Sequence, residues 1–269
     1  MISFLRTILT AATVVIVTMV LGLTVIIAAL LGVEDKPGGI YDKVPRWWSV
    51  WVLWAAGIRV RVHGLESGGP GGPRIFASNH VSWFDVPALA GVLPRYKFVA
   101  KAELFKVPIF GGAMRAVGMI EIQRENRKAA FGAYDVAAKR IKDGNSVVVF
   151  PEGTRGHAYP LRPFKKGPFV LAIAAEVPIV PIIVHGTIET LRKGSLRVHP
   201  GTIGIHLLEA VSTTGVDYDH REALMQTVRT KMADAMRDLY GVEPLPTPAS
   251  RLRSSVEMVS SETDPTETK

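Results

Sequence analysis

The chain of 269 residues contains no cysteine. This absence excludes disulfide bonds, thiolate metal sites and a cysteine nucleophile, and it suits a protein that faces the cytoplasm. Histidines with metal-ligand spacing are also missing, so we expect no metal and no bound cofactor. The sequence shows no internal repeat. Its length suits one α/β domain whose core is large enough to need no covalent cross-links.

Charge is absent from residues 7–33, a run of 27 residues rich in Val, Ile, Leu, Ala and Thr. As a helix this run would be about 40 Å long, enough to cross a bilayer core of about 30 Å. A cleaved signal peptide is the alternative, but its apolar region usually has only about 7–15 residues before a small-residue cleavage site. We therefore expect a membrane-attaching helix, which either spans the bilayer or dips into one leaflet.

A second apolar stretch, residues 47–56, is too short to span a membrane and holds four of the five tryptophans. Tryptophan prefers the headgroup level of a bilayer, where its ring is buried and its N–H stays hydrated. A helix packed on the protein core is the alternative. We favour the membrane interface, because the preceding helix would hold this stretch at the bilayer surface. Residues 1–57 are therefore predicted to form a membrane anchor.

From residue 58 onward the pattern alternates between short strands and helices. Expected strands are 58–63, 74–78, 96–100, 119–122, 146–150 and 179–184, followed by a hairpin of 196–199 and 202–207. Expected helices are 82–93, 108–117, 129–142, 168–175 and 219–240. Such alternation predicts an α/β domain over residues 58–243, with a mixed, largely parallel sheet covered by helices on both faces. Residues 244–269 are rich in Pro, Ser, Thr and acids and are predicted to be disordered.

Positive charge is concentrated in the middle of the chain. Residues 95–166 hold fifteen Lys and Arg against six Asp and Glu, whereas the net charge of the whole chain is +8. An excess of this kind indicates an anionic partner, such as a phosphate-bearing substrate, a lipid headgroup or a nucleic acid. No aromatic and basic platform or recognition helix is evident, so we do not expect nucleic acid to be the partner.

The segment Asn-His-Val-Ser-Trp-Phe-Asp at residues 79–85 follows a predicted buried strand. Open α/β sheets place their ligands at such strand ends. If the turn brings the carboxylate of Asp85 back to the imidazole of His80, one ring nitrogen is fixed and the other is free to accept a proton. This pair suits the deprotonation of an alcohol that attacks a thioester. The alternative is a capping box, in which Ser82 and Asp85 only start the helix.

Three further segments accompany this block. They are Gly-Met-Ile-Glu-Ile-Gln-Arg at 118–124, Phe-Pro-Glu-Gly-Thr-Arg at 150–155 and Val-Pro-Ile-Val-Pro at 177–181. In order and spacing the four blocks resemble the glycerolipid acyltransferase family, especially the bacterial 1-acylglycerol-3-phosphate acyltransferases. The resemblance covers about residues 58–214, and its His/Asp and Phe-Pro-Glu-Gly-Thr-Arg blocks are highly specific.

The resemblance implies that His80 is the general base and Asp85 its partner. It also implies a glycerol phosphate site, built from Arg124, Glu152, Gly153, Thr154 and Arg155. Guanidinium groups and turn N–H donors suit phosphate. Lys101, Lys165 and Lys166 are further candidates for phosphate or headgroup contact, with solvated surface lysines as the alternative. Pro178 and Pro181 are expected to shape the acyl-chain region.

Two residues depart from the family pattern. Glu121 stands where an apolar or aromatic residue is usual, and Gly156 replaces a frequent serine. A carboxylate near the phosphate site would repel a phosphomonoester or bind another headgroup. Glycerol-3-phosphate, a lyso-ornithine lipid or a glycolipid therefore remain alternative acceptors.

The sequence thus predicts a membrane-attached acyltransferase whose active site faces the cytoplasm. It would transfer a fatty acyl group from acyl-CoA or acyl carrier protein to the free hydroxyl of 1-acylglycerol-3-phosphate, giving phosphatidic acid. The rival from another class is a non-catalytic membrane protein that binds anionic lipid. Such a protein would not need His80 and Asp85 together at a strand end. The oligomeric state is left open.

Overall fold

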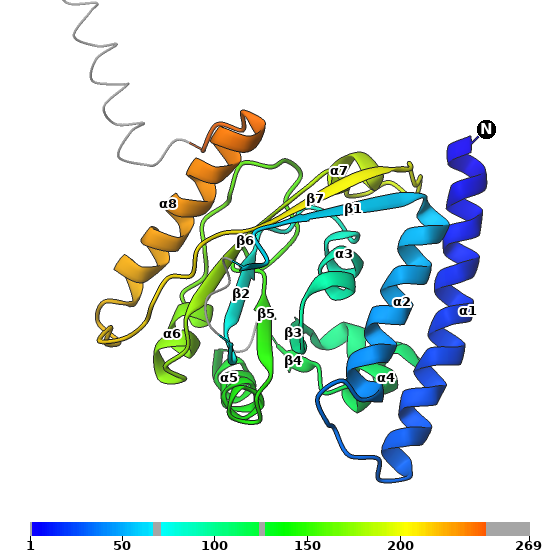
Figure 1. Cartoon of the computed structure of the whole chain (residues 1–269), viewed down its shortest axis with the longest axis horizontal. Coiled ribbons are helices and arrows are strands. Elements are labelled where there is room, and N and C mark those ends of the chain that lie inside the picture. The colour runs from blue at the N-terminus through cyan, green and yellow to red at the C-terminus, as the bar shows by residue number, and fades with distance from the viewer. Residues whose placement is uncertain (1, 67–70, 124–126, 246–269) are drawn as a thin grey trace, which may run out of the picture.

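The computed structural model describes residues 2–66, 71–123 and 127–245. Within these ranges the chain folds around one seven-stranded sheet with the strand order β1-β7-β6-β2-β5-β3-β4 (Figure 1). Neighbouring strands are parallel except for the β6–β7 pair. The predicted mixed, largely parallel α/β sheet is confirmed.

The strands match the predicted positions closely. They are β1 Ile58–His63, β2 Ile75–Ser78, β3 Tyr96–Lys101, β4 Ile120–Ile122, β5 Ser146–Val149, β6 Ile179–His185 and β7 Gly201–Leu207. Strands β2 and β5 are buried along their whole length, which explains their continuous apolar runs. Strand β1 alternates between buried and exposed residues because it lies at the edge of the sheet.

Helices cover both faces of this sheet. The described helices are α1 Ile2–Leu30, α2 Ile40–Ala56, α3 Asp85–Val92, α4 Phe110–Ala116, α5 Arg127–Lys142, α6 Gly167–Ala174, α7 Thr187–Thr190 and α8 Arg221–Tyr240, with a short 3-10 turn at Ala102–Lys106. One face packs against α2 and α3, and the opposite face against α5, α6 and α8 (Figure 1). Each large apolar side chain buried between these layers contributes roughly 1.5–3 kcal/mol.

The predicted hairpin of residues 196–199 and 202–207 is wrong. Only the second segment is a strand, and β7 pairs with β1 in parallel and with β6 in antiparallel orientation. The first segment meets the beginning of α1 instead. The backbone N–H of Val198 donates to Thr7 Oγ1 at 2.9 Å, and Ser3 Oγ donates to the carbonyl of Val198 at 2.8 Å. These bonds satisfy the backbone that a hairpin would otherwise have paired.

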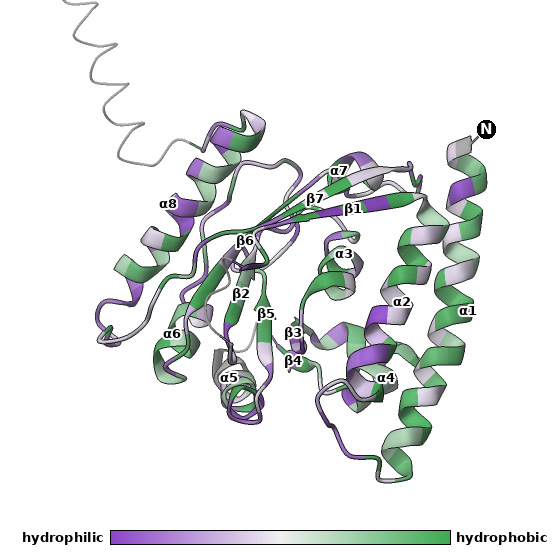
Figure 2. Ribbon diagram, in the orientation of Figure 1, coloured by the Kyte–Doolittle hydropathy of each residue, from purple (hydrophilic) through white to green (hydrophobic). Residues whose placement is uncertain are grey.

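Helix α1 is, among the described residues, the one helix long and apolar enough to cross a membrane. Figure 2 shows apolar residues along nearly its entire length. Its inner side is attached to α2, because Trp48 Nε1 donates to Thr18 Oγ1 at 2.9 Å and Arg6 donates to the carbonyl of Ala55 at 3.2 Å. Its outer side leaves large apolar side chains such as Phe4, Ile16 and Leu30 exposed.

Helix α2 combines both environments considered for the tryptophan-rich stretch. Val52, Leu53 and Ala56 are buried in the core between α2, α3 and the sheet. Trp47, Trp51 and Trp54 form an outward stripe, and each is about half exposed. Membrane contact by this stripe stays a prediction. The predicted end of the membrane anchor at residue 57 also stays a prediction. Helix α2 belongs to this predicted anchor but packs on the sheet. The predicted tail from residue 244 lies almost wholly outside the described residues.

Candidate active site

The turn after β2 is fixed first by Asn79. This side chain is fully buried, and it bonds the backbone of Val184 in both directions. Its Nδ2 donates to the Val184 carbonyl at 2.9 Å, and its Oδ1 accepts the Val184 N–H at 2.8 Å. The amide therefore continues the β2–β6 pairing beyond the end of β2, and the next residue, His80, leaves the sheet at a defined place.

The turn then brings His80 and Asp85 together. Asp85 Oδ2 lies 2.7 Å from His80 Nδ1, and it also accepts the backbone N–H groups of Val81 and Ser82 at 2.7 and 2.8 Å. The Asp85 side chain is fully buried, whereas 12% of the His80 side chain is exposed. A carboxylate with three donors orients the imidazole so that Nδ1 carries a proton. Nε2, which has no hydrogen bond among the described residues, is left to accept one.

The start of α3 bears on both interpretations of this block, capping and catalysis. The helix begins at Asp85, three residues later than predicted, and Pro87 lies in its first turn, where no backbone donor is needed. The hydroxyl of Ser82 donates to the carbonyl of Leu191 at 2.8 Å. Asp85 does bond the N–H of Ser82, as in a capping box, but it holds the imidazole with the same oxygen. Asp85 therefore makes one bond of a capping box and also contacts the imidazole, and its catalytic role stays a prediction.

The backbone and ring of His80 are held by the segment after β5. Glu152 Oε1 accepts the His80 N–H at 2.9 Å, and the N–H of Gly156 donates to the His80 carbonyl at 2.7 Å. The ring of Phe150 stacks on the imidazole, with centroids 4.0 Å apart. The imidazole thus has little freedom to turn, and its edge keeps one direction relative to the sheet.

Glu152 itself is buried, with only 2% of the residue exposed. Its second oxygen accepts the backbone N–H of Arg162 at 3.2 Å. Burial raises the pKa of Glu152 to about 7, against the lowering effect of its bonds to the N–H groups of His80 and Arg162. The implied role of this side chain as a substrate contact does not fit, because both oxygens face backbone donors inside the protein. In this structure Glu152 holds the backbone of His80 and of Arg162.

Arg155 lies at the exposed rim of the same loop. Its guanidinium sits 4.3 Å from the centre of the Trp83 ring, and Trp83 is 49% exposed. Partial burial lowers the pKa of Arg155, and the charge of Asp85 opposes this shift. Thr154 is exposed beside it, and Gly153 has a φ of 77°, a conformation that glycine adopts without strain. We refer to Trp83, Thr154 and Arg155 as the rim.

Two further cations surround the rim. Lys193 Nζ donates to the carbonyl of Arg155 at 2.8 Å, and the Arg162 guanidinium lies 3.4 Å from the carbonyl of Thr154. The sequence did not indicate either cation. It also did not indicate that Trp83 stacks on Arg155 or that Phe150 stacks on His80. Trp83 and Phe150 belong to the specific blocks, so their aromatic character was an available signal. Nothing in the order of residues indicated that Lys193 folds back onto this loop.

The other predicted phosphate contacts have different positions. Arg124 lies outside the described residues. Lys101 ends β3, where it pairs in register with Ile122, two residues before that arginine, and its side chain is 47% exposed near Glu103. Because β2 and β3 run in the same direction, Lys101 lies at the same end of the strands as the turn after β2.

Lys165 and Lys166 follow on the next loop. Lys166 forms an ion pair with Glu222 of α8, which suits a structural contact. Lys165 is exposed, and its side chain lies near Gly153. Glu121 is exposed on β4 and lies 3.7 Å from Arg115. This arginine partly neutralises the carboxylate that stood out in the sequence.

The two prolines of the fourth block belong to β6 and its start. The Pro178 carbonyl accepts the N–H of Ile75 at 3.0 Å, at the end of the sheet opposite the turn of His80. Pro181 is buried inside β6, level with Ala77 of β2. Their contacts are with the sheet, and a role near the acyl chain stays a prediction.

Comparisons with known proteins identify the family of the chain. Residues 59–185 match the family model described as Acyltransferase. The 1-acyl-sn-glycerol-3-phosphate acyltransferase alpha of Mus musculus is 37% identical over 186 residues, which cover 68% of this chain and 65% of that protein. The protein of the same name from Homo sapiens is 35% identical over 199 residues, which cover 73% of this chain and 70% of that protein.

A solved structure has the same fold. The crystal structure of the 1-acyl-sn-glycerophosphate (LPA) acyltransferase PlsC from Thermotoga maritima matches with a TM-score of 0.75 at 24% sequence identity. The match covers 88% of this chain and 95% of that one. The predicted resemblance to the glycerolipid acyltransferases is confirmed, and the chain belongs to the acyltransferase family.

Proposed function

We propose that the protein transfers a fatty acyl group from acyl-CoA or acyl carrier protein to the free hydroxyl of 1-acylglycerol-3-phosphate, giving phosphatidic acid. The observation that carries this proposal is the His80–Asp85 pair, with Nδ1 held 2.7 Å from a buried carboxylate and Nε2 unoccupied by any described residue. The activity printed in the names of the mammalian relatives gives the acceptor.

Acyl transfer is direct in this proposal. His80 Nε2 takes the proton of the acceptor hydroxyl as its oxygen attacks the thioester carbonyl carbon. The imidazolium is stabilised by Asp85. When the carbon–sulfur bond breaks, the imidazolium returns the proton to the departing thiolate. His80 therefore acts as a base and then as an acid, and no acyl group is attached to the protein.

In this proposal the acceptor phosphate binds at the rim. Arg155 is partly exposed beside the turn of residues 79–85, which we call the catalytic turn, and a guanidinium presents two parallel donors to a phosphate group. Thr154 adds a hydroxyl, and Arg124 and Lys101 are proposed to complete the site from β4 and β3. Glu152 acts from behind by holding the backbone of His80.

The protein is proposed to work at a membrane. The exposed apolar side of α1 and the tryptophan stripe of α2 supply the attachment. Because acyl-CoA and acyl carrier protein are cytoplasmic carriers, the active site would face the cytoplasm. The reaction as proposed uses no metal or bound cofactor, so we expect turnover to persist in EDTA.

A panel of acceptors tests this function. Full-length protein in nanodiscs is mixed with acyl-CoA, and thiol release is followed with a thiol-reactive dye. The chain lacks cysteine, so only the released carrier reacts. Release should depend on 1-acylglycerol-3-phosphate and yield phosphatidic acid by mass spectrometry. Preference for glycerol-3-phosphate, a lyso-ornithine lipid or a glycolipid would overturn the acceptor. Lipid binding without any thioester turnover would favour the non-catalytic alternative.

A further inference from the structure

One face of the sheet is polar at its β1 edge. In β1, Ile58, Val60 and Val62 turn toward the core formed with α2 and α3. Arg59, Arg61 and His63 therefore lie on the other face, since side chains alternate along a strand. Alternation in β7 likewise directs Ile203 and Ile205 inward and leaves their neighbours on the polar face.

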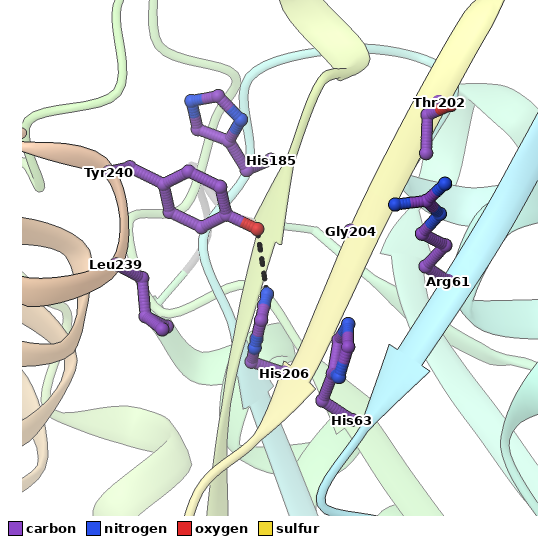
Figure 3. A pocket seen from close by; sticks show the side chains of 8 residues that line it. All are labelled: Arg61, His63, His185, Thr202, Gly204, His206, Leu239 and Tyr240. Atoms are coloured by element: carbon purple, nitrogen blue, oxygen red, sulfur yellow. Dashed lines mark hydrogen bonds between the residues drawn. The ribbon is translucent and has the colours of Figure 1, made fainter.

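A pocket of about 280 Å³ opens on this polar face. It lies between three strands, β1, β7 and β6, and the last turn of α8 (Figure 3). Its lining includes Arg61, His63, His185, Thr202, His206 and Tyr240. No lining residue is acidic. A concave site with one guanidinium, three imidazoles and no carboxylate favours an anionic ligand.

The rings in this pocket are already ordered. His63 and His206 stack with centroids 4.6 Å apart, and His185 and Tyr240 stack at 3.8 Å. The Tyr240 hydroxyl lies 2.7 Å from His206 Nε2 (Figure 3). Gly204 leaves room for this contact, because a Cβ at that position would lie 2.5 Å from the Tyr240 hydroxyl oxygen. The pocket therefore needs little rearrangement to receive a ligand.

Arg61 supplies the permanent charge. It has no hydrogen bond or ion pair among the described residues, although it stands at the pocket wall. Burial lowers the pKa of His185 and of His206, which favours their neutral forms, and a neutral imidazole keeps one N–H donor. Within the described ranges, no three His, Asp or Glu side chains are grouped to hold a metal ion. A guanidinium with neutral N–H donors suits a phosphate group.

The pocket lies next to the carboxyl end of β6, which is close to the catalytic turn. His185 directly follows Val184, whose backbone is bonded to Asn79 beside the catalytic turn. The His185 ring also stacks on Tyr159 at 4.2 Å, and Tyr159 lies in the loop that continues from Arg155. The His80 ring stacks on Phe150 on the α2 and α3 side, so a molecule with its thioester at His80 would pass over this end of the sheet to place a phosphate at Arg61 on the polar face.

We propose that this pocket is a second phosphate-binding site, distinct from the rim, and that it binds the nucleotide phosphates of coenzyme A, the carrier of the acyl donor. The anion site itself rests on the geometry of Arg61 and the histidines, whereas its assignment to the donor rests on the proposed function. Free inorganic phosphate is the other source of the same chemistry. The acceptor lysolipid would not depend on this pocket.

Calorimetric titration of the full-length protein in nanodiscs tests the site. Adenosine 3′,5′-bisphosphate, the phosphate-bearing end of coenzyme A, and inorganic phosphate are the two probes. The bisphosphate should bind wild type, and Arg61→Gln should weaken it by about tenfold, as loss of one guanidinium–phosphate contact implies. Arg59→Gln is the matched control, because Arg59 lies on the same strand face but outside the pocket lining. It should change binding less than about twofold.

Kinetics separate the donor from the acceptor. Arg61→Gln should raise KM for acyl-CoA and leave KM for the lysolipid unchanged. No bisphosphate binding by wild type, or equal losses in Arg61→Gln and Arg59→Gln, would overturn the site. Inorganic phosphate binding as tightly as the bisphosphate would overturn the donor assignment and keep the anion site. If wild type binds the bisphosphate but shows no lysolipid-dependent turnover, the proposed function fails and the site stands.

Discussion

The catalytic turn and the rim lie side by side but are built in opposite ways. The carboxylates that hold the turn, those of Asp85 and Glu152, are buried and face backbone N–H groups. At the rim, Arg155 is partly exposed and rests on Trp83, which is half exposed. Side chains whose orientation must stay constant are held by hydrogen bonds inside the protein. Side chains that would meet a mobile lipid headgroup remain accessible to solvent. Damage to the turn should therefore lower kcat, and damage to the rim should raise KM.

The largest effect is expected for His80→Ala. Loss of a general base typically reduces turnover by about 10²–10⁴-fold, equivalent to roughly 3–5 kcal/mol of transition-state stabilisation. The matched control is His157→Ala, which removes an exposed histidine from the neighbouring loop and should leave the rate nearly unchanged. Melting temperatures of both variants show whether the fold is intact. Near-normal turnover by a folded His80→Ala variant would show that damage to the turn does not lower kcat, so the turn and the rim would not differ as described.

Asp85→Asn should affect both rate and stability. The amide oxygen can replace Oδ2, but the NH₂ group then lies where Oδ1 is buried without a hydrogen-bond partner among the described residues. A buried unsatisfied donor costs about 1–3 kcal/mol. The neutral amide also cannot stabilise an imidazolium, so kcat should fall by about two orders of magnitude or more. A destabilised variant with normal kcat would show that Asp85 only holds the turn that precedes α3.

Glu152 offers a test through pH. Burial raises its folded-state pKa to about 7, so the folded protein binds this proton more tightly than the unfolded chain does. Its contribution to stability is complete below the ordinary pKa of glutamate and is lost as the pH rises to about 7, at up to roughly 1.4 kcal/mol per pH unit. Glu152→Gln cannot ionise and should lack this slope. Parallel melting curves between pH 5 and 7 for both proteins would contradict the buried position.

Arg155→Lys should have the smallest effect of the four. Lysine keeps the charge but loses the two parallel donors, so the KM for the lysolipid should rise by about tenfold while the KM for acyl-CoA stays constant. Arg124→Lys, measured beside it, tests the predicted partner from the segment after β4. A change in the donor KM alone would place these arginines at the carrier, and unchanged values for both substrates would make them structural.

Much of the fold could be predicted because it depends on local patterns. The Val-rich run of β5 and the alternation of β1 each indicate one kind of strand, and the spacing of His80 and Asp85 indicates their contact. The hairpin prediction was wrong because Val198 pairs with Thr7, a residue far away in sequence.

Tertiary contacts also explain what was missed at the site. The carboxylate of Glu152 was expected to meet substrate, but its partners are backbone groups of His80 and Arg162 that only the fold brings near. The stacking of Trp83 on Arg155 likewise joins two loops. A side-chain type indicates which contacts are possible, and the fold decides which of them form.

The central claim is that His80 acts as a base in a direct transfer and never carries the acyl chain. Rapid mixing of wild type with radiolabelled acyl-CoA, in the absence of acceptor, tests it. The account predicts that no thiol is released in the first turnover time and that no label remains on the denatured protein. Addition of 1-acylglycerol-3-phosphate should then release thiol and labelled phosphatidic acid together. A burst of one thiol per protein with label retained on the chain would contradict the account.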